Sequence, residues 1–340
     1  PYTTTAPALQ GSDANGAWGT ILSELLALRT ADASSRYYYG VVKVSYSSGV
    51  AGLGYVGGSA RTAMGWDYLP TGINIMAHEV GHNMGRLHAP CGGATGTDPA
   101  YPYAGGQIGV WGMDLSSLIL KAPTVTDVMS YCGPNWISDF NWSAMVSFRQ
   151  SGPNNAPAAG GSSAGLLIWG RITPSGVVLE PAFQVAAAAG TPPRPGSNRL
   201  ELLAADGSTL QSVSFEATEV ADLPGGREDH FAFVLPLSSG AQRGLAGLRV
   251  RAGSRIALRS SAAPAGADPA PQLSRPGAGQ LELRWDGVRF PMALVRDAAS
   301  GQILSFARGG AARLWAGGQA FDLQFSDGVR TVSLPARVLR

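Results

Sequence analysis

Residues 77–88 read Ala77-His78-Glu79-Val80-Gly81-His82-Asn83-Met84-Gly85-Arg86-Leu87-His88. This stretch decides the fold, and it holds three of the four histidines of the chain. On a helix, His78 and His82 lie one turn apart on the same face and can reach one metal ion. Gly85 can adopt a positive φ and end that helix, so that His88 can approach as a third ligand. Three histidines leave a fourth position open, which is typical of a catalytic zinc site.

The acidic residue in this stretch has a different predicted role. Glu79 is rotated away from the two helix histidines, so we expect it not to be a ligand. It can reach a metal-bound water as a general base and then pass the proton to a leaving amine. The competing interpretation is two histidines on a helix surface, a glycine cap and a histidine in a loop. Histidine is scarce here, and the match at five specified positions argues against that interpretation.

A second motif follows about forty residues later. The spacing H-E-x-x-H-x-x-G-x-x-H is a zinc-protease signature. The later motif reads Asp127-Val128-Met129-Ser130-Tyr131-Cys132 and resembles the Met-turn beneath the zinc of metzincins. Alone, Met129 would be interpreted as an ordinary core methionine. Together, the two motifs make the chain resemble the metzincin clan of zinc endopeptidases.

The resemblance implies roles for further residues and leaves the subfamily open. Met129-Ser130-Tyr131 is similar to the turn of the serralysin and astacin groups, where the tyrosine lies near the metal. Tyr131 is then expected to be a fifth ligand or a hydrogen-bond donor to developing oxyanion charge. Ala89, directly after His88, matches none of the best-known subfamily signatures. The run His-Asn-Met-Gly resembles adamalysin-like and mucin-directed bacterial enzymes.

The two cysteines flank the predicted metal site. Cys91 lies three residues after the third histidine and Cys132 three residues after Met129, so a disulfide between them is geometrically reasonable. Free thiols or an additional metal ligand are the alternatives. A disulfide implies an oxidising compartment, either secreted, cell-surface or periplasmic. The sequence begins at Pro1-Tyr2 without a signal peptide, so we expect that an upstream segment was removed or not included.

Composition limits the class of protein. A chain of 340 residues should hold two or three domains, and only 14% of its residues are charged, with a net charge of +2. There is no stripe of basic residues of the kind that binds nucleic acid, and no apolar stretch as long as a membrane span. Arginine greatly outnumbers lysine, which together with the alanine and glycine bias suggests a bacterial source. The sequence does not indicate an oligomeric state.

The first domain, residues 1–150, is predicted to be an α/β metzincin catalytic domain. Its expected order is one helix with an N-cap at Ser12 or Asp13, then strands and the metal-binding helix. The predicted ranges are a helix at 13–28, strands at 37–46, 49–57 and 59–67, and the metal-binding helix at 71–84. Segment 49–57 is the candidate for the edge strand that would hold an extended substrate. The strand that normally precedes the first helix looks missing, through truncation or because residues 2–5 supply it.

The loop after the third histidine, residues 91–112, is rich in glycine and tyrosine. It can line the cleft, bind structural Ca²⁺ through Asp98 and Asp114, contact sugars through aromatics such as Tyr101, Tyr103 and Trp111, or pack upon itself. Past the Met-turn, residues 134–140 are expected to form the S1′ wall, and a last helix capped at Ser138 or Asp139 runs to residue 150. Trp111 and Trp136 are candidate substrate-binding residues, and Trp142 is a further one. For the tryptophans a core position is the alternative.

The rest of the chain has the pattern of β-structure. Residues 151–163 have linker composition. Short alternating apolar runs separated by turns then predict an immunoglobulin-like sandwich at 164–262 and a smaller β module at 277–340, although the two can merge into one sandwich. The fourth histidine, His230, follows two acidic residues and is predicted to lie on the surface.

These features predict a secreted zinc-dependent endopeptidase with one catalytic Zn²⁺. Its substrates would be proteins, with a preference for glycoproteins or mucins suggested by the resemblance and the aromatic loops. The alternative is a glycoprotein-binding or adhesion protein in which the metal site is vestigial or structural.

Overall fold

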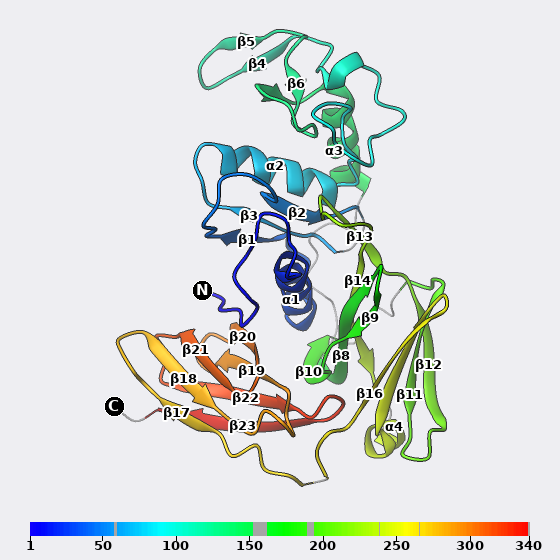
Figure 1. Ribbon diagram of the computed structural model, residues 1–340, viewed down its shortest axis with the longest axis vertical. Helices are drawn as coiled ribbons and strands as arrows, with labels where there is room; N and C mark the ends of the chain where they lie inside the picture. Colours follow the sequence, from blue (N-terminus) through cyan, green and yellow to red (C-terminus); the bar gives the residue numbers. More distant parts are fainter. Residues whose placement is uncertain (58–59, 152–161, 189–193, 238, 265, 339–340) are drawn as a thin grey trace.

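The structure is a computed structural model of the chain (Figure 1). It describes all residues except 58–59, 152–161, 189–193, 238, 265 and 339–340. Most of its regular structure is β-sheet with few helices. The predicted domain boundaries stay predictions, and most of the predicted linker at 151–163 lies outside the described residues. Among the described residues, none of the helices has both the length and the apolar character that a membrane span requires.

The N-terminal part is a three-stranded sheet between two helices (Figure 1). Its elements are α1 (Ala17–Ala31), β1 (Tyr38–Val42), β2 (Gly52–Tyr55), β3 (Thr62–Trp66) and α2 (Thr71–Asn83). Strand β3 lies between β1, to which it is parallel, and β2, to which it is antiparallel. The buried side chains of Trp18, Leu22 and Leu53 fill the space between α1 and the sheet, while α2 covers the other face.

Helix α1 begins four residues later than the sequence predicts. Gly16 takes the cap position with φ 66°, in the left-handed region that suits glycine. The predicted cap Asp13 still contributes, because its carboxylate accepts a hydrogen bond from the Trp18 amide at 2.7 Å. The other helix and strand predictions of this part agree with the structure to within a few residues at each end.

The segment after α2 forms a separate layer above it, as Figure 1 shows. It contains a 3₁₀ turn, four short strands and a helix: η1 (Ala104–Gly106), β4 (Gly112–Asp114), β5 (Ile119–Lys121), β6 (Thr126–Asp127), β7 (Asn135–Trp136) and α3 (Asp139–Ser151). The strands pair as β4 with β5 and β6 with β7. Helix α3 confirms the predicted helix that ends near residue 150.

Beyond residue 162 the described chain is β-structure apart from one short helix, as predicted. The first group consists of β8 (Ser162–Thr173), β9 (Gly176–Leu179), β10 (Phe183–Ala188), β11 (Asn198–Leu203), β12 (Thr209–Phe215), β13 (Thr218–Ala221), β14 (Asp229–Pro236), α4 (Ser239–Gly244), β15 (Gly247–Ala252) and β16 (Arg255–Ser260). Two sheets enclose its core, with β8 and β14 on one side and β11 and β15 on the other. Strand β8 is buried on both faces, which explains its continuous apolar run Leu166-Leu167-Ile168-Trp169.

This β region is not separate from the N-terminal sheet. Strand β13 pairs with β2 on one side and with β14 on the other, so one sheet runs in the order β1-β3-β2-β13-β14-β8-β10 through the described residues. The sequence pattern predicts two independent units. The connection brings the turn after β13 to the metal-binding helix α2.

The last group of strands forms its own sandwich around a second core. It comprises β17 (Gln272–Ser274), β18 (Gln280–Arg284), β19 (Met292–Asp297), β20 (Ile303–Arg308), β21 (Ala311–Trp315), β22 (Ala320–Ser326) and β23 (Thr331–Arg337). One sheet has the order β17-β18-β21 and the other β20-β19-β22-β23. Met292, Leu294 and Phe306 of the second sheet pack against Trp169 and α1, which joins the two ends of the chain.

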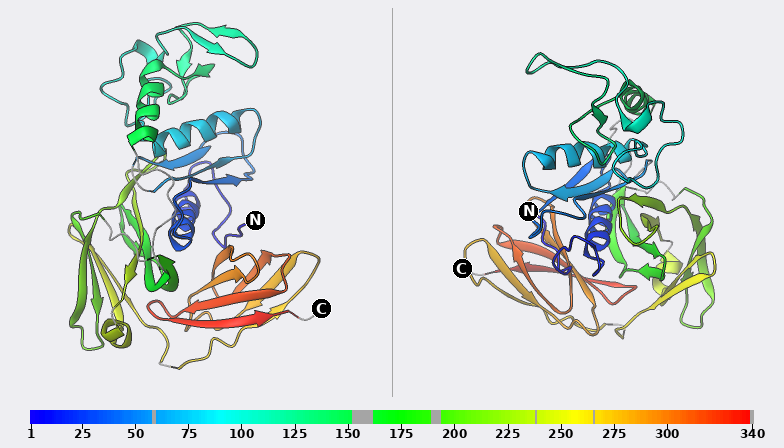
Figure 2. Two further views of the ribbon diagram at one scale, coloured as in Figure 1. Left: turned by 180° about the vertical axis from the view of Figure 1, so that it is seen from behind. Right: turned by 45° about the horizontal axis from the view of Figure 1, so that its top comes forward.

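The N-terminal residues do not supply the missing strand of the first sheet. They lie against the last β module, as Figure 2 also shows. The Thr3 amide donates a hydrogen bond to the Leu304 carbonyl at 2.8 Å, and the Arg308 amide donates to Thr5 Oγ1 at 3.1 Å. Tyr2 donates to Glu24 of α1 at 2.8 Å. The expectation that residues 2–5 form a strand of the first sheet is therefore wrong.

Candidate metal centre

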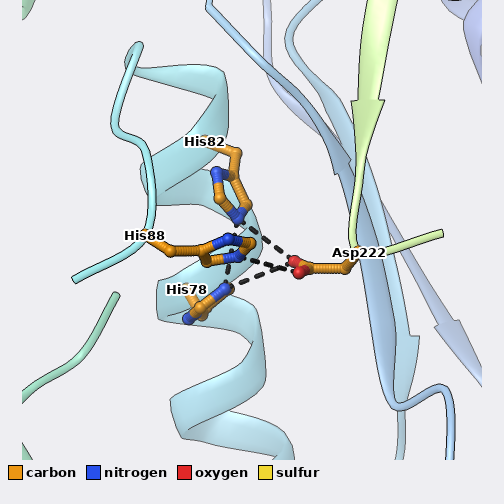
Figure 3. A group of neighbouring side chains, drawn as sticks. All are labelled: His78, His82, His88 and Asp222. Carbon is orange, nitrogen blue, oxygen red and sulfur yellow. Dashed lines mark hydrogen bonds and ion pairs between the residues drawn. The ribbon is translucent and has the colours of Figure 1, made fainter. Parts of the chain in front are cut away.

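Three histidines converge from two directions (Figure 3). His78 and His82 lie one turn apart on α2, and His88 follows in the loop after Gly85. Gly85 has φ +79°, the positive value expected where the helix ends and the chain turns back. The three side chains are almost fully buried, with exposed fractions of 7%, 1% and 4%. The structure thus brings together all three predicted ligands.

The backbone fixes which nitrogen of each ring faces the centre. The Nδ1 atoms of His78 and His82 lie 2.7 Å from the carbonyl oxygens of Val128 and Arg86. His88 Nδ1 makes the same kind of bond to the Thr95 carbonyl. A carbonyl oxygen only accepts, so each Nδ1 carries a proton, and in the neutral ring each Nε2 keeps its lone pair for a metal. Burial also lowers the pKa of His82, which favours its neutral form.

The ring geometry suits a shared cation. The Nε2 atoms of His78 and His82 are 3.1 Å apart, and when both rings are neutral with Nδ1 protonated, neither Nε2 can donate to the other. Two lone pairs facing each other at that distance repel unless a positive charge lies beside them. Three neutral imidazole nitrogens are a donor set that suits Zn²⁺. The residues therefore fit the metal that the sequence predicts.

A fourth group, Asp222, completes the cluster. It lies directly after β13, about 140 residues beyond His82, and its side chain is 8% exposed. Its carboxylate oxygens lie 2.8 Å from His88 Nε2, 3.1 Å from His82 Nε2 and 3.3 Å from His78 Nε2. The four candidate ligand atoms all lie within 4.8 Å of one another, so this buried group could bind a metal ion. No sequence motif indicates Asp222 as a ligand.

Glu79 lies beside the cluster and is not part of it. Its side chain is buried, and Oε2 has no hydrogen-bond partner. Burial raises the pKa of Glu79 well above 4.5, and the neighbouring charge of Asp222 raises it further. The carboxylate packs against β2, where a Cβ at Gly52 would lie 2.5 Å from Glu79 Oε1. Glycine at position 52 is therefore what leaves room for the predicted base.

The Met-turn lies beneath the histidines. Met129 is fully buried, and its carbonyl accepts a hydrogen bond from the Ala89 amide at 2.9 Å. The buried Asp127 holds the turn, because its carboxylate accepts bonds from the Met129 and Ser138 amides at 2.7 and 2.8 Å and from Asn141 at 2.8 Å. The turn also presents the Val128 carbonyl to His78. Asp127 is the first residue of the motif, but neither its spacing nor its residue type indicates that it organises the turn.

Tyr131 reaches the same centre from the Met-turn. Its ring centroid lies 5.0 Å from that of His88, and its hydroxyl donates a short hydrogen bond to Asp222. The next residue, Cys132, forms the predicted disulfide with Cys91, which the structure confirms. The bond ties the Met-turn to the loop that follows His88. Its presence agrees with an oxidising environment.

A cavity of about 670 Å³ opens beside the cluster. Its walls include β2, α2, the Met-turn and the segment after β13, with Gly52, Ile75, Glu79, Tyr131 and Asp222 among the lining residues. The predicted substrate contacts Trp111 and Trp136 do not line it. Trp111 is 67% exposed, and Trp136 is half-buried with the Lys121 ammonium 5.1 Å from its ring centre.

The long loop 91–112 contributes no second metal cluster within the described residues. Asp98 instead pairs with Arg86 at 3.0 Å, and Asp114 accepts hydrogen bonds from the Ser116 amide and hydroxyl. Tyr101 packs edge-on against Tyr103 and Phe140. These contacts favour the interpretation of a loop whose aromatics pack upon themselves.

His230 was predicted to lie on the surface, and that prediction is wrong. The residue is fully buried on β14. Its Nδ1 lies 2.7 Å from the Tyr55 hydroxyl of β2, and its Nε2 lies 3.1 Å from Glu228. The adjacent acidic residues suggested a solvated turn, but the pairing of β13 and β14 turns His230 towards the N-terminal sheet.

Comparison with known proteins supports a peptidase. Residues 10–146 match the Peptidase M66 family. The M66 match includes the three histidines, Glu79 and the Met-turn, and it ends before Asp222. No curated protein matches the chain. Among solved structures, the central fibronectin-III array of RIM-binding protein is 14% identical to this chain. The match covers 55% of this chain and 66% of the RIM-binding protein chain. The TM-score of 0.19 is too low to indicate a shared fold.

Proposed function

We propose that this chain is a secreted zinc-dependent endopeptidase with a metzincin-type catalytic domain. The observation that carries the proposal is the convergence of three histidine Nε2 atoms next to a buried glutamate at the wall of a cavity. The M66 match over the same residues supports a peptidase independently. The disulfide supports secretion.

The protein's own groups suit amide hydrolysis. His78, His82 and His88 would hold Zn²⁺, which when bound polarises a carbonyl and lowers the pKa of water. Glu79 would accept a proton from the attacking water as the new carbon–oxygen bond forms. It would deliver that proton to the amine nitrogen as the carbon–nitrogen bond breaks.

Tyr131 is the proposed hydrogen-bond donor to the developing oxyanion. Its hydroxyl already reaches the centre of the cluster, where it donates to the negatively charged Asp222 carboxylate. A donor placed where negative charge develops contributes about 3 kcal/mol to lowering a barrier. Tyr131 would donate the same hydrogen bond to a substrate oxyanion once the Asp222 carboxylate has left the centre.

The substrate class is proposed to be glycoproteins or mucins. Segment 49–57, with β2 inside it, would hold an extended peptide along the edge of β2 that β13 occupies in the structure. The exposed Trp111 and the neighbouring Trp136 lie outside the cavity, where they could contact the sugars of a glycosylated chain rather than the peptide itself. No second metal, Ca²⁺ included, enters the proposed reaction.

The test is cleavage of a heavily O-glycosylated mucin-type protein beside casein. The zinc-loaded chain is compared with a chelator-treated sample and with Glu79→Gln, in wild-type and Asp222→Asn backgrounds because Asp222 fills the centre. We expect chelator-sensitive cleavage that Glu79→Gln lowers at least about a thousandfold while the zinc content is kept. Cleavage by Glu79→Gln at the full rate would overturn the mechanism.

A binding or adhesion protein with a structural metal site is the second candidate. Asp222 favours it, because four protein ligands resemble a closed structural site rather than an open catalytic one. The same experiment decides between the two. Zinc bound tightly by the wild-type chain, with no cleavage of either substrate in any background, would select the binding protein.

A further inference from the structure

We propose that the β13–β14 hairpin blocks the metal site, and we call this role of the hairpin the stopper. Asp222 acts as a fourth metal ligand, and β13 occupies the substrate-binding edge of β2, so the described conformation is latent. Withdrawal of residues 218–228 would open the site. The proposal rests on the proposed endopeptidase function, whose activity the hairpin would regulate.

Asp222 has the geometry of a ligand. Its carboxylate lies in the space on which the three Nε2 atoms converge (Figure 3), where an open catalytic site would admit water or a substrate carbonyl. The backbone at Asp222 has φ +65°, a left-handed conformation that costs a residue with a side chain about 1 kcal/mol. Such outliers persist where the surroundings enforce them, and they gather at functional sites.

The backbone beside Asp222 imitates a bound peptide. Strand β13 pairs antiparallel with β2, placing Val220 opposite Tyr55 and Ala221 opposite Gly54. The Val56 amide donates to the Glu219 carbonyl at 3.0 Å. Because β3 holds the other edge of β2, this is the edge to which an extended substrate would add. Leu223 and Pro224 continue the chain along the wall of the catalytic cavity.

The hairpin is built so that one strand can leave while the other stays. Strand β14 pairs with β8 over eight positions and is anchored to β2 through His230 and Tyr55. Strand β13 has two paired positions with β14 and two with β2. The exposed turn between them contains Gly225 and Gly226, both at positive φ, which leaves the backbone free to rearrange. Opening therefore need not disturb the β-sandwich core.

The experiment removes the carboxylate and keeps the backbone. Asp222→Asn and Asp222→Gly both tolerate the left-handed conformation. Glu219→Gln is the matched control, because this β13 side chain only pairs with Arg227 at the surface. Each variant is loaded with Co²⁺, and its visible absorption and its affinity for a simple hydroxamate are measured. Amide hydrogen exchange at Val56 and cleavage of casein and of the mucin-type protein complete the comparison.

We expect both Asp222 variants to show a changed Co²⁺ spectrum and at least about tenfold tighter hydroxamate binding, which corresponds to about 1.4 kcal/mol. Exchange at Val56 and cleavage should each rise at least about tenfold, while Glu219→Gln behaves as wild type. An unchanged spectrum and hydroxamate affinity would overturn Asp222 as a ligand. Reduced cleavage by both Asp222 variants would overturn the stopper, because the carboxylate would then assist the reaction.

The outcomes separate this proposal from the proposed function. Cleavage at one rate by all four chains, with identical Co²⁺ spectra, would leave the endopeptidase standing and overturn the stopper. If the spectrum, the hydroxamate affinity and Val56 exchange change as expected but no chain cleaves either substrate, Asp222 is a ligand and the hairpin covers the site. The endopeptidase function is then overturned, and with it the latency.

Discussion

The sulfur of Met129 lies directly against Gly81, the glycine between the two histidines of α2. A Cβ at Gly81 would overlap that sulfur and would lie 3.0 Å from Met145 Cε. Gly81→Ala should therefore push the Met-turn away from α2 and cost about 1–3 kcal/mol, as overpacked cores do. Since the turn also holds His78 through Val128, zinc affinity should fall too. Urea unfolding and zinc titration measure the two effects.

A second helical glycine provides the control for Gly81→Ala. Gly240 in α4 has open space where its Cβ would be, so Gly240→Ala should stabilise the chain by up to about 1 kcal/mol. Met129→Ala should offset much of the damage in the Gly81→Ala background, because the two changes act on one contact. Additive costs in the double variant would show that the overlap is not the cause.

The sequence predicted the local half of the candidate site and missed the distant half. His78, Glu79 and His82 share one helix, so their spacing alone fixes which side chains meet. Asp222 lies in an unremarkable Asp-Leu-Pro-Gly-Gly turn about 140 residues after His82, and only the pairing of β13 with β2 carries it to the three histidines. Neither hydrophobic periodicity nor a motif encodes that pairing, because a short strand can join either edge of a sheet.

The dependence on contacts between distant segments also explains which other predictions from the sequence failed. Alternating apolar runs predicted the C-terminal β-structure, since period two is a property of each strand by itself. They did not show that β8 is buried on both faces or that residues 1–5 pack on the last module. Those placements depend on contacts between segments far apart in the sequence, such as the ring contact of Trp169 with Phe306 and the bond from the Arg308 amide to Thr5. His230 was misplaced for the same reason.

Removing the disulfide should lower both the free energy of unfolding and the zinc affinity. Cys91 and Cys132 are separated by 41 residues, so the bond removes about 4 kcal/mol of loop entropy from the unfolded chain. A Cys91→Ala, Cys132→Ala chain should unfold at a lower urea concentration. Its zinc affinity should also fall, because the Cys91 carbonyl accepts from the Tyr131 amide and aligns the two segments. Unchanged zinc affinity would limit the disulfide to global stability.

Arg308 should be one of the costliest arginines to remove. It pairs at 3.0 Å with Glu24, which is fully buried on α1, and at 2.8 Å with Glu180. Burial raises the pKa of Glu24, and Arg308 opposes that rise. Arg308→Ala leaves a buried carboxylate uncompensated and should cost about 3 kcal/mol in chemical unfolding.

Two further variants test that explanation. Glu24→Gln in the Arg308→Ala background should recover part of the loss, because it removes the stranded charge. Arg227→Ala, which breaks surface pairs with Glu219 and Asp229, should cost less than about 1 kcal/mol. If Glu24→Gln restores nothing, the cost of Arg308→Ala comes instead from lost packing on Trp169, over which the guanidinium lies.

His230 should make stability depend on pH in one direction. The Glu228 carboxylate can only accept, so Nε2 of His230 carries the proton and Nδ1 accepts from the Tyr55 hydroxyl. The His230 imidazole is therefore neutral. Burial lowers the pKa of His230 below 6.5, although Glu228 and Asp229 oppose the shift and Arg171 adds to it. The unfolded chain thus binds this proton more readily. The stabilisation is complete above about pH 6.5 and is lost as the pH falls towards the lower folded pKa.

The expected slope is at most about 1.4 kcal/mol for each pH unit below 6.5. Other groups titrate in the same range, so the difference between wild type and His230→Gln isolates this residue. Unfolding free energies of the zinc-free chains between about pH 5 and about pH 8 should decline more steeply in wild type. Parallel curves would mean that His230 has the same pKa in the folded and unfolded chains, and a less steep decline in wild type would mean that it is charged in the folded chain. The Tyr55 hydroxyl would then have to act as acceptor, and the neutral anchor between β14 and β2 would not exist.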